Sequence, residues 1–317
     1  QPGRRAGMTL PTGGFVAISV TPLDATGAVD FDDLSNLMRF YLDSGVDGVA
    51  LLGVMGEANR MTDADARIVV EHAVAAIGGR VPVIVGVSDP SLQRVRSLGE
   101  FSMENGCEGV LLQPLAGLKG DRAVSGYFQE AGKALGSDIP ICVQDFPKAN
   151  NVHISLDAWR MILDECPTVV MLKLEDEPGL GKLSAIRQAE DQGLRPVTIF
   201  TGNNGIHLVQ ELGRGSDGAM TGFAFPDVLG QVVALFKAGR TSEAEDLFDQ
   251  YLPVNRHELR TGISVRKEIL RRRGALRTAT ARFPAGPLDE VDLDELDILL
   301  ARLERVTGLP ITEIRTG

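Results

Sequence analysis

Eight short apolar runs, each followed by a stretch of helical length, recur between residues 15 and 238 of this 317-residue chain. Because the runs are apolar almost throughout, they predict strands buried on both faces, as in a parallel sheet. Eight such βα units predict the α/β class and a closed (β/α)8 TIM barrel, with a doubly wound open sheet as the alternative. The predicted strands cover 15–20, 48–52, 81–85, 109–113, 139–144, 169–173, 197–201 and 218–221.

The pattern changes after residue 238, where the strand signal stops. Segments 241–258, 265–273 and 293–306 have the spacing of amphipathic helices. We therefore expect a barrel at 8–238 and, at 239–317, a C-terminal helical appendage packed on the barrel. Within the barrel the clearest helix spans 62–77, because Thr62 and Asp65 have capping-box spacing and Gly78 supplies a stop.

Charge and cysteine content narrow the class of protein. A net charge of −11 argues against a nucleic-acid or anionic-membrane partner, since both require a basic surface. No apolar stretch reaches the roughly 18 residues of a membrane span. Cys107, Cys142 and Cys166 are odd in number and widely spaced, so neither a disulfide framework nor a cysteine zinc site is predicted. We expect a cytoplasmic protein that binds a small molecule.

Lys173 ends the apolar run 169–172 and precedes the acidic run 175–177. In an α/β barrel the C-terminal ends of the strands carry the chemistry, and a lysine amine there can form a Schiff base with a carbonyl substrate. The alternative interpretation is a lysine that extends from a strand end into solvent. The residues at the other strand ends bear on this choice.

Four further strand ends carry groups suited to a small acid. In the turn 53–57, glycines allow close backbone approach, so that N–H groups around Val54 and Met55 can hold a carboxylate. Each group is individually compatible with an ordinary turn or cap, but all of them face one rim of the predicted barrel. The candidates are Gln144 and Asp145 after strand five, Gly202 and Asn203 after strand seven, and Thr221 at the end of strand eight.

In these features the chain resembles the dihydrodipicolinate synthase and N-acetylneuraminate lyase superfamily over nearly its whole length. The turn 53–57 matches the superfamily's Gly-Thr/Ser-Thr-Gly-Glu turn, and Lys173 matches its Schiff-base lysine after strand six. The turn at Gly202 and the three C-terminal helices also fit. The resemblance implies a (β/α)8 barrel, often a tetramer, whose lysine condenses with pyruvate or another 2-oxo acid. Such enzymes make or break a carbon–carbon bond or dehydrate a sugar acid, and the covalent imine takes the place of a cofactor.

The chain differs from that superfamily at the residues that transfer protons. Gln144 stands where the superfamily has a tyrosine, and an amide can form hydrogen bonds but cannot act as a general acid or base. Val54 and Met55 replace hydroxyl residues, and Ala149 replaces the arginine for the synthase's second substrate. We therefore predict a class I lyase or aldolase that is neither a true dihydrodipicolinate synthase nor a true N-acetylneuraminate lyase.

Asp145 and Glu175 are the nearest candidates to replace the tyrosine, and a substrate carboxylate or a bound water could serve instead. Alternation along a strand puts Lys173 on the same face as Val169, with Glu175 in the same phase. The same alternation turns Asp145 to the face opposite Gln144, unless the strand end curls. All three tyrosines, Tyr41, Tyr127 and Tyr251, fall in predicted helices rather than at strand ends.

Three other functions remain open. A 2-oxo sugar-acid dehydratase could use the same site, and an inactive homologue could bind a small acid or act as a scaffold. A metal-dependent lyase would need Glu175, Asp176 and Glu177 as ligands, but adjacent carboxylates point in different directions. We therefore predict no metal site, and we expect a homo-oligomer, either a tetramer or a dimer.

Overall fold

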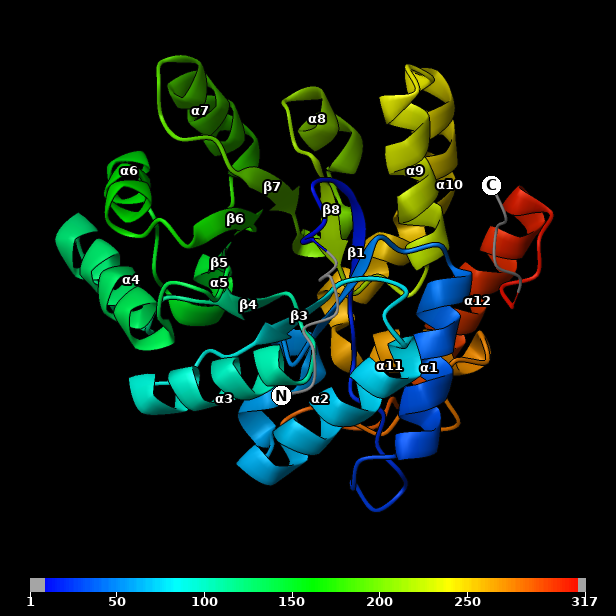
Figure 1. The fold of residues 1–317 in the computed structure, drawn as a ribbon. Helices are drawn as coiled ribbons and strands as arrows, with labels where there is room; N and C mark the ends of the chain where they lie inside the picture. Colours follow the sequence, from blue (N-terminus) through cyan, green and yellow to red (C-terminus); the bar gives the residue numbers. More distant parts are fainter. Residues whose placement is uncertain (1–8, 313–317) are drawn as a thin grey trace.

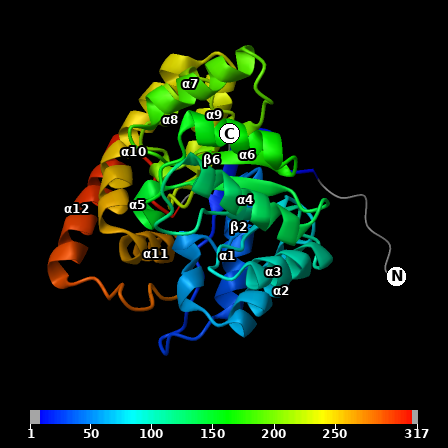
Figure 2. The same ribbon diagram turned by 90° about the vertical axis from the view of Figure 1, so that its left-hand side faces the viewer.

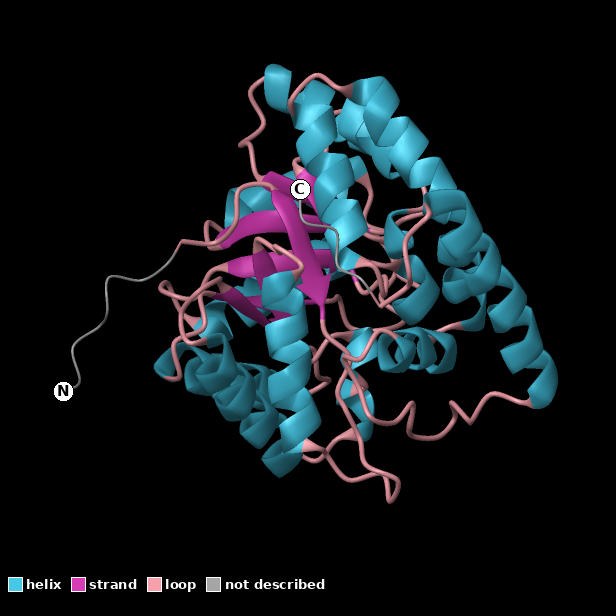
Figure 3. Ribbon diagram, turned by 90° about the vertical axis from the view of Figure 1, so that its right-hand side faces the viewer, coloured by secondary structure: helices cyan, strands magenta, loops and turns pink. Residues whose placement is uncertain are grey.

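The computed structural model describes residues 9–312, which form a closed barrel of eight parallel strands joined in sequence order. Helices surround the strands on all sides, as Figures 1 and 3 show. This architecture confirms the predicted (β/α)8 TIM barrel and excludes the open sheet. The strands are β1 (Gly14–Ile18), β2 (Gly48–Leu51), β3 (Val83–Gly86), β4 (Gly109–Leu112), β5 (Ile141–Asp145), β6 (Val169–Leu174), β7 (Thr198–Thr201) and β8 (Gly218–Thr221).

One main helix follows most strands, with shorter helices at the strand ends. The barrel helices are α1 (Phe31–Asp43), α2 (Asp63–Ile77), α3 (Leu92–Glu104), α4 (Asp121–Leu135), α5 (Pro147–Asn150), α6 (Leu156–Glu165), α7 (Gly179–Asp191), α8 (Leu208–Gly213) and α9 (Pro226–Lys237). Single 3₁₀ turns are η1 (Val54–Gly56), η2 (Ala58–Arg60) and η3 (Asn203–Gly205). None of the helices formed by residues 9–312 is both long and apolar enough to cross a membrane.

Helix α2 begins where the sequence predicted. The Thr62 hydroxyl accepts a hydrogen bond of 3.0 Å from the Asp65 N–H, and Gly78 ends the helix in a left-handed conformation. The Asp65 carboxylate lies 3.6 Å from Arg282 instead of closing the predicted capping box. Of the two hydrogen bonds of a capping box, α2 therefore has only the one accepted by Thr62.

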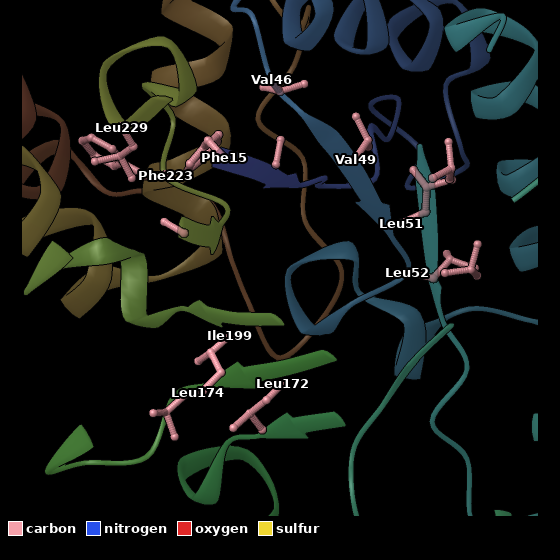
Figure 4. Packing of buried hydrophobic residues seen from close by; sticks show 14 of the residues in the cluster. Phe15, Val46, Val49, Leu51, Leu52, Leu172, Leu174, Ile199, Phe223 and Leu229 are labelled. Atoms are coloured by element: carbon pink, nitrogen blue, oxygen red, sulfur yellow. The ribbon is translucent and has the colours of Figure 1, made fainter. Parts of the chain in front are cut away.

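The strands separate two apolar clusters. Inside the barrel, Leu10 packs against the inward cluster before β1, and Met55 packs against it after β2. The outer cluster fills the space between strands and helices, and Figure 4 shows Val49, Leu172 and Ile199 of this layer. The inward cluster consists of Val16, Ile18, Ala50, Ile84, Leu111, Cys142, Met171, Phe200 and Met220.

One detail of the predicted face assignment is wrong. Val169 pairs with Ile141 and belongs to the outer cluster, whereas Met171 pairs with Cys142 inside the barrel. Between these pairs β6 has one residue more than β5, so Val170 forms a bulge and is exposed. A bulge shifts the alternation of side chains by one residue. Lys173 nevertheless keeps the phase of Met171.

The C-terminal region consists of α10 (Thr241–Thr261), α11 (Ile263–Arg272) and α12 (Glu290–Thr307), close to the predicted helices. Figure 2 shows α12 beside α10, with α11 near the end of both. Helix α10 also packs along α9, the last barrel helix. Residue 8 of the predicted barrel and residues 313–317 of the predicted appendage lie outside the described residues.

Candidate active site

Lys173 and Glu175 form a buried ion pair at the C-terminal end of the barrel. The Lys173 Nζ lies 2.9 Å from the Glu175 Oε1, and the side chains are only 6% and 8% exposed. The Gln144 Nε2 donates a hydrogen bond of 2.7 Å to the same Oε1. Lys173 and Gln144 are paired in register across β6 and β5, which explains why both reach one carboxylate. A buried amine, a carboxylate and an amide therefore meet within hydrogen-bonding distance.

Asn203, after β7, holds the other carboxylate oxygen of Glu175, and Gly202 makes room for it. The Asn203 N–H donates a hydrogen bond of 3.0 Å to Oε2, and the Asn203 side chain donates one of 3.0 Å to the Glu175 carbonyl. Gly202 leaves room for this carboxylate, because a Cβ at that position would lie 2.4 Å from it. Gly202 and Asn203, both predicted site residues, thus contact Glu175 directly.

Asp145 lies on the other side of the sheet. Its carboxylate is buried and pairs with Lys182 of α7, which also donates a hydrogen bond of 3.0 Å to Asp176. Burial raises the pKa of Asp145 to about 6, and the Lys182 charge opposes the shift. Only the backbone of Asp145 reaches towards the site, because its carbonyl accepts a hydrogen bond of 2.8 Å from the Glu175 N–H. The structure brings Glu175, not Asp145, to Lys173.

The turn after β2 supplies backbone donors. The Gly56 and Glu57 N–H groups bond within the turn, whereas no hydrogen bond from the Val54 or Met55 N–H is found within residues 9–312. Met55 packs on the inward apolar cluster, and Val54 is exposed. This turn can therefore accept an anion through its backbone and cover it with an apolar side chain.

Thr221 is buried at the end of β8, one residue after the inward-facing Met220. Alternation along the strand turns Thr221 away from the barrel interior. Its hydroxyl accepts a hydrogen bond of 3.2 Å from the Phe223 N–H. The structure therefore places Thr221 at the end of β8, facing away from the barrel interior, with its hydroxyl bonded to the turn that follows.

The acidic run 175–177 does not converge on one point. Asp176 bonds Lys182 and lies 3.5 Å from His153 Nδ1, and Glu177 lies 2.8 Å from Lys148. Across the described part of the chain, no three histidine, cysteine or acidic side chains are grouped as metal ligands. The three carboxylates therefore pair with different basic side chains, Glu175 with Lys173, Asp176 with Lys182 and His153, and Glu177 with Lys148.

Glu211 of α8 is a second buried acid near the site that the sequence did not single out. Burial raises the pKa of Glu211 to about 7; a hydrogen bond from Thr201 lowers it and the Glu175 charge raises it. The Glu211 Oε2 has no hydrogen-bond partner among the described residues. No local signal could have found it, because a glutamate in a short helix is usually a surface residue.

All three tyrosines lie in helices, as predicted, in α1, α4 and α10. Burial raises the pKa values of Tyr41 and Tyr127 to about 12, so neither phenol ionises near neutral pH. Glu175 is the side chain in hydrogen-bonding contact with both Lys173 and Gln144 that can exchange a proton.

Residues 11–303 match the sequence profile of the dihydrodipicolinate synthetase family. L-2-keto-3-deoxyarabonate dehydratase from Azospirillum brasilense is 28% identical over 297 residues, which cover 92% of this chain and 94% of that protein. 4-hydroxy-tetrahydrodipicolinate synthase from Aquifex aeolicus is 30% identical over 174 residues, covering 55% of this chain and 58% of that protein. The crystal structure of dihydrodipicolinate synthase from Rhodopseudomonas palustris is similar with a TM-score of 0.90 at 38% identity, covering 93% of this chain and 100% of that one.

Proposed function

The chain belongs to the dihydrodipicolinate synthetase family, and from this membership we propose that it is a Schiff-base-forming lyase acting on pyruvate or another 2-oxo acid. In this proposal Lys173 forms the imine, Glu175 moves the protons and the turn after β2 binds the substrate carboxylate. The covalent imine with Lys173 serves as the electron sink, so the reaction needs no other cofactor.

The contact of 2.9 Å between the Lys173 amine and the Glu175 carboxylate carries the proposal. An amine must lose a proton before it attacks a carbonyl, and a carboxylate in contact with it can accept that proton. A buried charge pair is costly to hold out of water, and this one sits where barrel enzymes place their reactive groups. Imine formation therefore explains this arrangement better than a lysine without a function does.

The steps follow from the groups in contact. The Lys173 nitrogen attacks the 2-oxo carbon, and loss of the oxygen as water, with protons moved by Glu175, leaves a protonated imine. In a 4-hydroxy-2-oxo acid, Glu175 then accepts the hydroxyl proton while the bond between carbons 3 and 4 breaks. The electrons of that bond move into the imine, which becomes an enamine, and carbon 4 leaves as an aldehyde. The enamine then takes a proton at carbon 3, and water hydrolyses the imine to release the 2-oxo acid and free Lys173.

Gln144 has a different part in this scheme. Its amide donates to the Glu175 Oε1, so it orients the carboxylate and cannot itself carry the proton. The N–H groups of Val54 and Met55 would take the carboxylate at carbon 1, on the side of the barrel formed by β2. The apolar Val54 and Met55 side chains supply no hydroxyl relay, which separates this site from that of a dihydrodipicolinate synthase.

A sugar-acid dehydratase is the second candidate, supported by the similarity to L-2-keto-3-deoxyarabonate dehydratase over nearly the whole chain. There the imine would acidify carbon 3, Glu175 would remove that proton, and the hydroxyl on carbon 4 would leave as water. Both candidates use Lys173 and Glu175 and differ only in the bond that breaks. An inactive binding homologue would not need a buried amine, whose desolvation costs stability.

Borohydride reduction with a panel of 2-oxo acids tests the proposal. The panel contains pyruvate, 2-oxobutyrate, 2-oxoglutarate and 2-keto-3-deoxyarabonate. We expect at least one acid to become covalently attached to Lys173, as seen by intact mass and peptide mapping, and Lys173→Ala to abolish the adduct. Lys182→Met is the matched control, because this part-buried lysine also pairs with carboxylates but lies outside the barrel. Label on another lysine, or none with any acid, would favour a binding protein.

We also propose a homo-oligomer, a dimer or a tetramer, in the cytoplasm. Val291 and Ile298 of α12 are 65% and 70% exposed, and a partner subunit would shield such side chains. Light scattering tests the assembly, since a mass near the 34.0 kDa of one chain would refute it.

A further inference from the structure

Helix α11 places two consecutive buried cations, Arg266 and Lys267, at the C-terminal end of the barrel. Each cation bonds a different turn that follows a strand. The Arg266 Nη2 donates a hydrogen bond of 2.7 Å to the Asn204 Oδ1, after β7. The Lys267 Nζ donates one of 2.7 Å to the Glu57 Oε2, after β2. Arg266 is 4% exposed and Lys267 is 1% exposed. Neighbouring residues of a helix point about 100° apart, which allows one helix to reach both turns.

The turn after β7 is backbone-strained. Asn203, Asn204 and Gly205 have consecutive positive φ values of 48°, 60° and 70°. Non-glycine residues in this region cost on the order of 1 kcal/mol each and persist where the surrounding structure holds them. Asn255 of α10 holds the turn together with Arg266, since its side chain donates a hydrogen bond of 2.7 Å to the Asn204 carbonyl. The turn held in this way directs the Asn203 N–H at Glu175.

The turn after β2 is strained in the same way. Leu52 and Glu57, at its two ends, have φ values of 55° and 56°. Besides Lys267, the Arg282 N–H donates a hydrogen bond of 2.7 Å to the Glu57 Oε1, and Thr21 donates one of 2.7 Å to the Gly56 carbonyl. These contacts fix the segment that presents the Val54 and Met55 N–H groups.

Both cations have further hydrogen-bond partners, which fix the orientation of their side chains. The Arg266 Nε lies 2.6 Å from the Glu258 Oε1, and Lys267 donates a second hydrogen bond of 2.7 Å to the Thr280 carbonyl. A Cβ at Gly222 would lie 2.7 Å from the Arg266 Nη1, so the guanidinium occupies the space beside the end of β8. Buried ion pairs add little net stability compared with apolar packing, but they fix direction. Here they fix the two turns that the proposed chemistry uses.

We propose that α11 is a positioning helix for two separate steps, through Lys267 for binding of the substrate carboxylate and through Arg266 for proton transfer by Glu175. This inference rests on the proposed function, in which those two turns serve those two steps. It predicts that the two ion pairs can be removed with different kinetic consequences.

Two readouts separate the steps. The pyruvate concentration that gives half-maximal borohydride trapping on Lys173 reports substrate binding. The rate at which the pyruvate methyl protons exchange in D₂O, at saturating pyruvate, reports proton transfer after imine formation. If another acid of the panel labels Lys173 better, it replaces pyruvate in both measurements.

The Arg266 pair is removed in the double variant Arg266→Met/Glu258→Gln, which leaves no unpaired buried charge. We expect proton exchange to fall about tenfold or more, with the half-maximal trapping concentration changed less than about twofold, because only the Glu175 geometry is loosened. Asn204→Gly removes the acceptor of Arg266 while tolerating the positive φ, and should give the same pattern.

The Lys267 pair is removed in Lys267→Met/Glu57→Gln. Here we expect the half-maximal trapping concentration to rise about tenfold, with the exchange rate at saturation within about threefold of the unmodified protein. The matched control is Arg273→Met/Asp227→Asn, which removes a pair of 2.8 Å, equally buried, that joins the end of α11 to α9. It should lower stability and leave both readouts unchanged per folded molecule.

The outcomes distinguish this inference from the proposed function. If the unmodified protein labels Lys173 and both pair variants behave like the control, the positioning role is wrong and the lyase proposal stands. If both pair variants lose both readouts in equal measure, the helix is only structural. If no acid labels Lys173 in the unmodified protein, both proposals are overturned together.

Discussion

The Glu175 carboxylate occupies the space that a side chain at Gly202 would fill. A Cβ on Gly202 would lie 2.4 Å from three atoms of the Glu175 side chain. The glycine after β7 therefore admits the acid that contacts Lys173, although the two residues lie on neighbouring strand ends.

Gly202→Ala should displace the Glu175 carboxylate from Lys173. We expect exchange of the pyruvate methyl protons to fall about tenfold or more, because a shift of about 1 Å in a reacting group is costly. Gly181→Ala in α7, where an added Cβ meets no atom within 4 Å, is the matched control and should leave exchange unchanged. Equal rates in the two variants would contradict the packing relationship.

Glu175→Gln should separate imine formation from proton transfer. The amide keeps the shape but cannot exchange a proton, so methyl exchange should fall by about 10²- to 10⁴-fold. The Lys173 adduct should still form on prolonged incubation with borohydride. Asp176→Asn is the control, because the neighbouring carboxylate bonds Lys182 instead. Unchanged exchange in Glu175→Gln would assign the proton to another group.

Gln144→Ala should weaken turnover while the Lys173 imine remains trappable, because it removes the hydrogen bond of 2.7 Å that orients Glu175. Gln144→Tyr should not create a dihydrodipicolinate synthase, since a phenol there would lie without a hydroxyl relay at Val54 and Met55. Methyl-proton exchange and borohydride trapping check Gln144→Ala, and a coupled assay with pyruvate and aspartate semialdehyde checks Gln144→Tyr. Robust synthase activity in the unmodified protein would overturn this interpretation of the site.

Exhaustive chelation should leave the exchange rate unchanged, because the protonated imine, not a Lewis acid, accepts the electrons. The measurement compares methyl exchange before and after dialysis against EDTA. A rate that is lost and then restored only by magnesium would contradict the metal-free mechanism.

Stability should depend on pH through Glu211. Burial raises the pKa of this group from 4.5 to about 7, so the folded protein retains a proton that the unfolded chain releases. The stability from this group is fully present below its unfolded pKa and is lost as the pH rises through about 7, by up to ~3 kcal/mol.

Glu211→Gln removes that dependence. The difference in unfolding free energy between about pH 5 and about pH 8, measured by urea denaturation, should shrink by a few kcal/mol in this variant. Glu245→Gln, at an exposed position of α10, is the control and should behave like the unmodified protein. An unchanged pH dependence in Glu211→Gln would show that the Glu211 carboxyl is ionised at both pH values.

The sequence alone determined the barrel and the position of its lysine. Apolar runs alternating with helical stretches record burial on both faces of each strand, and this property is local enough to be read from the chain. The placement of Lys173 at the end of β6 follows from the same pattern. Alternation also predicted correctly that Asp145 faces away from Gln144 and that Glu175 shares the phase of Lys173, but it did not decide which of the two acids contacts Lys173.

The tertiary structure decided the rest. Only the register between β5 and β6 reveals the bulge at Val170, which moved Val169 to the outer layer. Only the turn after β7 brings Asn203 to Glu175, 28 residues away, and only the fold brings Lys267 to Glu57, 210 residues away. Local periodicity records which face of an element is buried. Pairing of charges between distant elements depends on how those elements pack, so no pattern within either segment carries it.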